Sequence, residues 1–221
     1  METLPPFVTP LTLGLLGAAV ILILTNDWRV SGVILSIQYG LAALLVAQVA
    51  IWQVAAVKAL VGVLAVGILG LSSRELSSSR ARSEAPSAAD EPPAPRPRLA
   101  LLRGLEFSTN LPFRLAASLL VIVGVWYLLT ESGYDFPNVP SGFDFASGLL
   151  VTLGLLNLGL TEEPMNTGAG LLTFITGFDL LYVAVEPSLA VVALMAAVHF
   201  GVALAISYLA GLRYARDEGS G

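Results

Sequence analysis

The stretch IWQVAAVKALVGVLAVGILGL, residues 51–71, decides the fold, because it is long and apolar enough to cross a lipid bilayer as one helix. A helix needs about 20 apolar residues to cross the hydrocarbon core. The stretch contains one charge, Lys58, which is also the only lysine of the chain. A charge at the centre of a membrane helix costs about 2.5–3.5 kcal/mol on the insertion scale, so such a residue usually faces protein or water and marks function.

The composition of the whole chain predicts a membrane protein. Of its 221 residues, 56% are hydrophobic and 12% are charged, whereas soluble domains carry about 25% charged residues. There is no cysteine, which excludes disulfides, thiolate metal sites and cysteine nucleophiles. With one histidine and three methionines, the chain lacks the ligands of a haem or zinc site, so we expect no cofactor and no metal. The sequence also lacks a phosphate-binding loop and a nucleic-acid-binding patch.

Six further apolar stretches predict an all-α, polytopic membrane helix bundle of about seven transmembrane helices. The break between the second and third spans is the least defined, because no glycine or proline marks it. The predicted spans cover residues 7–24, 30–46, 51–71, 113–130, 146–160, 167–185 and 188–212.

These spans divide the chain into four parts. Residues 1–73 form a first three-helix membrane repeat. Residues 74–98 are predicted to be a flexible cytoplasmic linker, because this Ser- and Pro-rich stretch cannot bury enough apolar surface to become ordered. Residues 99–145 hold a connecting segment, the fourth transmembrane helix and an outer loop; the connecting segment either lies along the inner membrane surface or extends the fourth helix. Residues 146–221 form a second three-helix repeat and a cytoplasmic tail.

The charges predict the orientation of the bundle. If the N-terminus lies outside, every basic residue except Lys58 falls in or beside an inner segment, and the outer segments hold only acidic residues. This distribution is the one that the positive-inside rule requires. We therefore expect the linker and the C-terminus in the cytoplasm, with the inner arginines close to anionic membrane lipid.

A short repeat predicts that the first and last three spans correspond. TLGLL occurs at residues 12–16 and again at 152–156, 140 residues apart. Lys58 and His199 are 141 residues apart, and their spans run in the same direction. A chance match of five letters is the alternative. A parallel 3+3 repeat joined by one extra helix would be typical of transport proteins.

Three ionisable side chains lie well inside the predicted spans, tyrosines aside: Lys58, Asp179 and His199. At 1.5 Å per residue, Lys58 and Asp179 lie about 10 and 9 Å from the outer ends of their spans, so their opposite charges lie at similar depth. Lys58 is interpreted as a proton-relay lysine, as a snorkelling side chain whose ammonium reaches the outer interface, or as a static ion-pair partner of Asp179.

His199 lies about 16 Å from the outer end of its span, near the midplane. It is interpreted either as a proton relay or as a residue that hydrogen-bonds two helices. It points away from a ridge of small residues that would allow close helix packing. This ridge consists of Ala193, Ala197, Gly201 and Ala205.

Other polar residues support two interpretations each. A stripe along the sixth span either holds a file of water to the outer face, or consists of threonines bonded to their own helix beside a paired Asp179. Gln38 and Asn157 either join helices through hydrogen bonds or extend a hydrated path. The stripe consists of Thr173, Thr176, Asp179 and Glu186.

The chain resembles the hydrogenase-4 component E family, which is related to the K-type (4L) subunit of complex I and to the C-type subunit of multisubunit cation/proton antiporters. The resemblance rests on DWRVSG (27–32), on the lone lysine of VAAVKALVGVLAVGIL (54–69), and on LTEEPMN (160–166) followed by TGAGLLTFITGFDLLYVAV (167–185). Relatives place a glutamate in the middle of the sixth span. Here Asp179 either takes that role one turn later, or the subunit has lost the path and is structural.

The resemblance implies an integral membrane subunit of an energy-converting redox complex in the inner membrane of a prokaryote. Such a subunit would line or brace a proton or sodium path beside antiporter-like and other membrane subunits, without being an enzyme in its own right. Lys58, Asp179 and His199 are the candidate path residues. Two alternatives stay open, namely a self-contained small transporter and a scaffold subunit without an ion path.

Overall fold

The fold is described here from a computed structural model, which covers residues 8–84, 111–130, 139 and 142–219. Within these ranges all the regular secondary structure is α-helical, as predicted. The helices are α1 (Val8–Leu24), α2 (Trp28–Val46), α3 (Trp52–Glu84), α5 (Leu111–Thr130), α6 (Phe143–Leu160), α7 (Pro164–Val185) and α8 (Leu189–Gly219).

Six of the described helices are long and apolar enough to cross a membrane, so the chain is a multi-pass membrane protein. The shorter helix is α1, whose 17 residues lie at the lower limit for a membrane span. The weakly marked break between the second and third spans is confirmed. After Val46 the chain makes a short turn, in which the backbone N–H of Gln48 donates to the Leu45 carbonyl at 3.1 Å.

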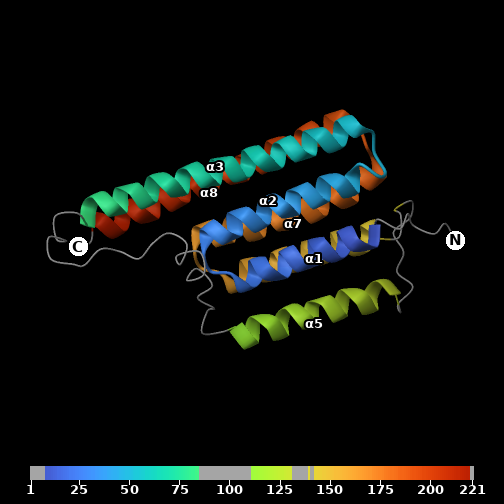
Figure 1. Cartoon of the computed structure of the whole chain (residues 1–221), viewed down its shortest axis with the longest axis horizontal. Helices are drawn as coiled ribbons and strands as arrows, with labels where there is room; N and C mark the ends of the chain where they lie inside the picture. Colours follow the sequence, from blue (N-terminus) through green and yellow to red (C-terminus); the bar gives the residue numbers. More distant parts are fainter. Residues whose placement is uncertain (1–7, 85–110, 131–138, 140–141, 220–221) are drawn as a thin grey trace.

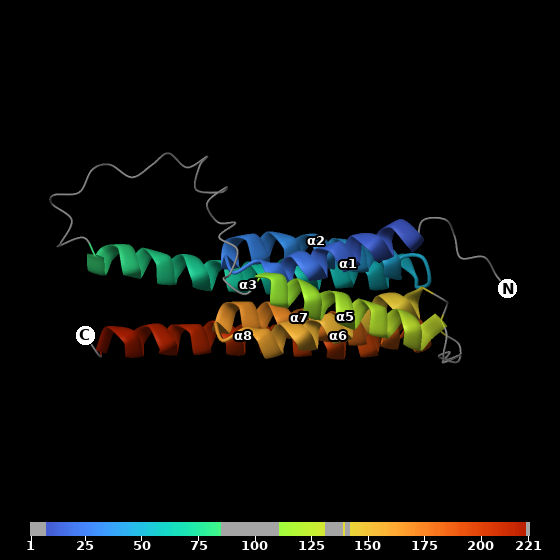
Figure 2. The ribbon, with the colours of Figure 1, turned by 90° about the horizontal axis from the view of Figure 1, so that it is seen from below.

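The helices form two layers of three (Figure 2). One layer holds α1, α2 and α3, and the other holds α6, α7 and α8. Each helix packs beside its neighbours in its own layer and against its counterpart in the other, so that α1 contacts α6, α2 contacts α7 and α3 contacts α8. Counterparts run in the same direction, and α5 packs against α1 and α6 at one edge (Figure 1). Among the described helices, this arrangement matches the predicted parallel 3+3 repeat.

The two ends of the bundle differ in charge. We call the end at which α2 and α5 begin the arginine end, because it holds Arg29, Arg114 and Arg213. We call the opposite end, where α7 leads into α8, the Glu186 end. The described arginines thus gather at one end, as the charge pattern predicts, while the side of the membrane that this end faces stays a prediction.

The predicted linker begins later than expected, because α3 continues to Glu84 and includes residues 74–84. This part of the sequence contains the good helix formers Leu, Glu, Arg and Ala, and Pro86 follows the helix end. Both α3 and α8 extend beyond the other helices at the arginine end (Figure 2). The rest of the linker and the predicted interfacial segment, up to residue 110, lie outside the described residues.

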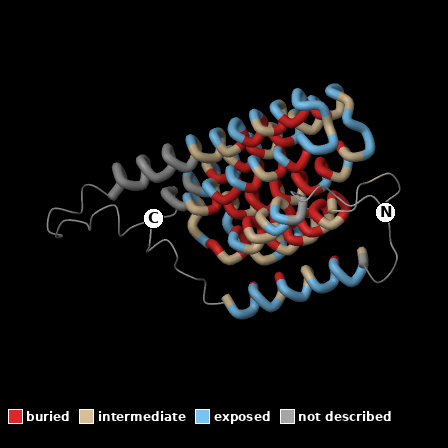
Figure 3. Tube along the Cα trace, turned by 45° about the vertical axis from the view of Figure 1, so that its right-hand side comes forward, coloured by how far each residue is buried: buried red, intermediate tan, exposed pale blue. Residues whose placement is uncertain are grey.

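Buried residues concentrate between the two layers (Figure 3). The central helix is α7, because 61% of its apolar stretch is buried, against 17% for α5. The exposed surface of α5 includes Leu120, Trp126 and Tyr127. This surface is therefore available to lipid or to a partner subunit.

Glycines allow α6 and α7 to approach closely. A Cβ atom added at Gly154 would lie 2.5 Å from the backbone nitrogen of Phe174, and one added at Gly177 would lie 2.7 Å from that of Val151. These distances are too short for carbon, so only glycine fits. Close backbone approach through small residues is a usual way for membrane helices to associate.

The small-residue ridge of α8 does not make such a contact in the described part of the chain. Its four members are exposed, and a Cβ atom added at Gly201 would meet nothing within 4 Å. The reason is that α8 turns the face of His199, which is 1% exposed, into the bundle. The prediction that His199 points away from the ridge is confirmed, but the ridge faces outward.

Candidate functional site

The central feature of the candidate site is an ion pair between the two layers. Lys58 lies on α3, and its ammonium donates a hydrogen bond to Oδ2 of Asp179 on α7. The two side chains are 4% and 7% exposed. Of the three interpretations of Lys58, snorkelling is therefore excluded, because the ammonium is turned into the bundle.

His199 and Tyr39 lie beside this pair. The two rings meet edge to face, with centroids 5.7 Å apart and an interplanar angle of 62°. Nδ1 of His199 lies 2.8 Å from the Met195 carbonyl oxygen, so Nδ1 carries a proton and donates it to that oxygen. Gly62 of α3 makes room for Tyr39, since an added Cβ atom would lie 2.5 Å from the Cβ and Cγ of the tyrosine.

The two contacts are related by the repeat. Lys58 on α3 and His199 on its counterpart α8 lie 141 residues apart, and Tyr39 on α2 and Asp179 on its counterpart α7 lie 140 residues apart. The contact from α3 to α7 in one half thus has its counterpart in the contact from α8 to α2 in the other. Tyr39 was not among the predicted site residues, because tyrosines are common inside membrane spans, although its 140-residue spacing to Asp179 equals that of the TLGLL repeat.

A small cavity joins the four side chains of Tyr39, Lys58, Asp179 and His199. Its volume is about 10 Å³, close to the minimum that one water molecule requires. Three polar atoms in the cluster have no hydrogen-bond partner among the described residues: the Tyr39 hydroxyl, Oδ1 of Asp179 and Nε2 of His199. The arrangement therefore offers one hydroxyl donor and two acceptor atoms to a small polar guest.

Apolar side chains lie beside this cluster on both sides along the bundle. Val54, Val183 and Val192 also line the cavity, and all three are buried. Towards the arginine end lies a buried apolar cluster that includes Leu35 and Leu172. The described residues thus hold the pair in apolar surroundings, where electrostatic interactions are strong.

The polar stripe of α7 does not form a continuous file. The hydroxyls of Thr173 and Thr176 donate to the carbonyl oxygens of Ala169 and Leu172 in their own helix, at 2.9 and 2.7 Å. This geometry matches the interpretation in which the threonines bond back to their helix and Asp179 is paired. Glu186 is exposed at the end of α7 and does not line the cavity.

The structure places Gln38 and Asn157 outside the cavity. Gln38 is fully buried, and neither of its amide atoms has a hydrogen-bond partner in the described part of the chain. Oδ1 of Asn157 accepts from the Thr161 hydroxyl at 3.1 Å, and a Cβ atom added at Gly170 would lie 3.2 Å from Asn157. Asn157 therefore belongs to the contact between α6 and α7.

Arg114 of α5 has a structural role, although the sequence indicated it only as one of the arginines that set the orientation of the bundle. It is 8% exposed. Nη1 donates to the Ile23 carbonyl oxygen at 2.8 Å, and Nη2 donates to that of Leu160 at 3.0 Å. These carbonyls belong to the C-terminal turns of α1 and α6, which lack partners within their helices and favour a nearby cation.

Asn166 was also missed, and it joins the layers at the arginine end. Its Oδ1 accepts from the Ser31 hydroxyl at 3.2 Å, and its Nδ2 donates to the Asn26 carbonyl oxygen at 3.1 Å and to Oε2 of Glu163 at 3.0 Å. The side chain therefore holds the start of α7 against the start of α2. Like Arg114, it fixes the helices that position the site.

No group of three or more His, Asp or Glu side chains is placed to hold a metal ion within the described ranges. No family model matches the chain, and neither a curated protein nor a solved structure matches it.

Proposed function

We propose that this membrane protein is a subunit of an energy-converting redox complex, in which the cluster around Lys58 and Asp179 lines or braces a path for protons or sodium ions. The observation that carries the proposal is the buried ion pair beside three polar atoms without partners. The resemblance to the hydrogenase-4 component E family supports the same class. Since we expect no cofactor in this chain, partner subunits would drive the transport.

The energetics of the pair favour a functional role. Removing two charges from water costs several kcal/mol for each ion, and a well-packed apolar pair is often equally stable or more stable. The bundle therefore gains little stability from Lys58 and Asp179 as a pair. Ionisable residues that lie inside a membrane bundle and pair with each other are typical of ion pathways and proton relays.

The three polar atoms without hydrogen-bond partners suggest how a proton would move through the cluster. A proton that binds Oδ1 neutralises Asp179 and weakens its attraction for Lys58. The ammonium then gives up a proton to a water molecule in the cavity or to Nε2 of His199, and a proton passed from Asp179 back to Lys58 restores the pair. The Tyr39 hydroxyl can both donate and accept, so it can connect Oδ1 with Nε2.

Coupling to a partner follows from the surroundings of the cluster. Apolar residues lie between the pair and both ends of the bundle, so ions would pass only when helices shift. Exposed faces of α5 and of the α8 ridge give antiporter-like subunits a surface from which to cause such a shift. We place this complex in the inner membrane of a prokaryote, with the arginine end in the cytoplasm.

Two other functions predict different results. A self-contained transporter would bind and move its substrate when purified alone. A scaffold would need the pair only to fix helix register, an interpretation that the pairing of the two charges and their apolar surroundings also support. The scaffold predicts that a variant with both charges replaced assembles and still pumps.

The test is to tag the chain in its native host, purify it in mild detergent and identify the proteins that accompany it by mass spectrometry. Antiporter-like and redox subunits are expected. Proton pumping by inverted membrane vesicles is then compared for Lys58→Met, Asp179→Leu and the double variant, with Gln38→Leu as the control for a buried polar residue outside the cavity. Full pumping by an assembled double variant would rule out the proposed path.

A further inference from the structure

A second feature, away from the ion pair, is a groove of about 760 Å³ on the first layer between α2 and α3. Its volume lies within the range of about 300–1,000 Å³ that is usual for small-molecule sites. Cβ atoms added at Gly32 and Gly67 would meet nothing within 4 Å, so these glycines leave the groove open. The apolar side chains that line it include Val33, Leu35, Val63, Val66, Leu69 and Leu71.

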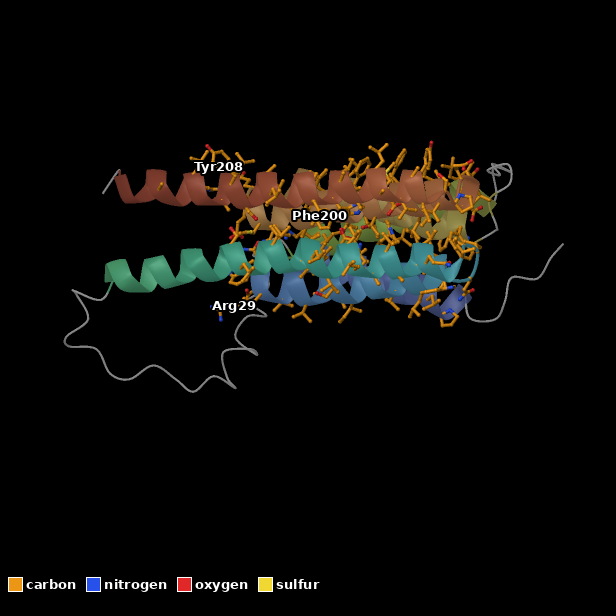
Figure 4. All side chains as sticks on the ribbon, turned by 90° about the horizontal axis from the view of Figure 1, so that it is seen from above. Arg29, Phe200 and Tyr208 are labelled. Carbon is orange, nitrogen blue, oxygen red and sulfur yellow. The ribbon has the colours of Figure 1, made fainter. Side chains whose placement is uncertain are left out.

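One end of this groove is polar. Trp28 and Arg29 line it where α2 begins, at the arginine end. The guanidinium of Arg29 lies 5.3 Å from the centre of the Trp28 ring, and the side chain projects from α2 away from the second layer (Figure 4). Tryptophan is enriched at the membrane–water interface, so this end lies at headgroup level.

Asp27 comes before α2, and its carboxylate accepts from the backbone N–H of Arg29 and caps the helix. Among the described residues, the Arg29 guanidinium forms no ion pair, and it lines the groove. Two hydroxyls at the groove are already engaged, because Ser31 donates to Asn166 and Ser36 donates to the Gly32 carbonyl oxygen. The cation is therefore the group available for a ligand.

We propose that the groove binds an anionic phospholipid, with its phosphate on Arg29 and one acyl chain along the apolar walls. Along the groove, Arg29 and Trp28 are followed by apolar side chains, just as the charged headgroup of a phospholipid is followed by its acyl chain. From Val63 to Leu71 the groove follows α3 for about 12 Å, which covers most of one leaflet of a hydrocarbon core about 30 Å thick. A guanidinium binds phosphate oxygens through two parallel hydrogen bonds.

Photo-crosslinking tests this site. The full chain is placed in vesicles of phosphatidylcholine that contain a trace of a lipid with a photoreactive group on its acyl chain. In one sample this photoreactive lipid is phosphatidylglycerol, and in the other it is phosphatidylcholine. Labelled peptides are identified by mass spectrometry. We expect α2 and α3 peptides to be labelled about fivefold more by phosphatidylglycerol, the discrimination expected from roughly 1 kcal/mol per arginine near an anionic headgroup.

Variants separate this site from ordinary lipid contact. Arg29→Gln should abolish the preference, whereas Arg213→Gln, which removes another arginine of the same end, should keep it. Gly67→Leu should block labelling in the groove while the unfolding temperature shows that the fold is kept. Equal labelling by both lipids, or no labelling of α2 and α3 because another segment covers them, would overturn the proposal. Competition by inorganic phosphate alone would also overturn it, since the acyl chain would then be dispensable.

Discussion

Tyr39 on α2 and Asp179 on its counterpart helix α7 lie 140 residues apart, and both side chains line the same cavity. Asp179 meets Lys58, whereas Tyr39 meets His199. The repeat thus brings four titratable side chains to one place, where Lys58 and Asp179 form a salt bridge and Tyr39 and His199 form an edge-to-face ring contact. This arrangement separates the role of the tyrosine ring from that of its hydroxyl.

Tyr39→Phe should leave stability almost unchanged, because the hydroxyl has no hydrogen-bond partner among the described residues and the ring contacts with His199 and Gly62 persist. Tyr39→Ala should cost about 3–5 kcal/mol, as for other large aromatic truncations. Unfolding in detergent measures both. If the hydroxyl belongs to the path, Tyr39→Phe lowers proton pumping, while Tyr127→Phe on the exposed face of α5 does not. A large loss of stability in Tyr39→Phe would show that the hydroxyl is structural.

Lys58 and Asp179 should behave as a coupled pair. Lys58→Met or Asp179→Leu leaves one buried charge without its partner, and each should destabilise the bundle by about 3–5 kcal/mol. The double variant should lose less than either single variant, because no charge then stays buried. A double-mutant cycle of unfolding free energies measures the coupling. Additive losses would mean that each side chain acts through other contacts.

The helices and their pairing could be predicted from the sequence, because apolar length and the position of arginines are constrained by the bilayer itself. The apolar run around Lys58 predicted a span, and its spacing to His199 predicted that α3 and α8 correspond. The extension of α3 to Glu84 was missed, since low hydropathy marks the end of a span but not the end of a helix.

The candidate site was predictable only in part. Ionisable residues are easily recognised inside an apolar span, so Lys58, Asp179 and His199 could be predicted as site residues. The structure brings these three side chains together. Side-chain direction depends on tertiary packing, which decides that Tyr39 lines the cavity while Gln38 does not. For the same reason, the small residues of α8 predicted a packing surface but not that this surface faces outward.

Gly154 and Gly159 of α6 offer a matched test of helix packing. Gly154→Ala should destabilise the bundle by about 1–3 kcal/mol, because the added Cβ atom would lie 2.5 Å from the backbone of Phe174 and α6 would have to move. Gly159→Ala meets nothing within 4 Å, so it should be neutral or slightly stabilising through helix propensity. Unfolding free energies in detergent compare the two. Equal effects would show that α6 and α7 lie farther apart than described.

Arg114→Leu should loosen the arginine end of the bundle. The guanidinium is buried and donates to the last turns of both α1 and α6, so the substitution leaves two carbonyl oxygens without a partner. Hydrogen bonds from a charged group contribute about 1.5–3 kcal/mol each, and we expect a total loss of about 2–4 kcal/mol because some carbonyls will find water.

Arg114→Lys should recover only about half of this loss, because an ammonium is a compact donor that cannot span two carbonyls as a planar fork does. Arg213→Leu is the control at the same end. Its single bond, to the Glu162 carbonyl oxygen at 3.0 Å, is exposed, so its loss should stay within about 0.5 kcal/mol. Unfolding free energies rank the three variants. If Arg114→Lys were as stable as the unsubstituted protein, the charge at the helix ends would matter and the bridge between α1 and α6 would not.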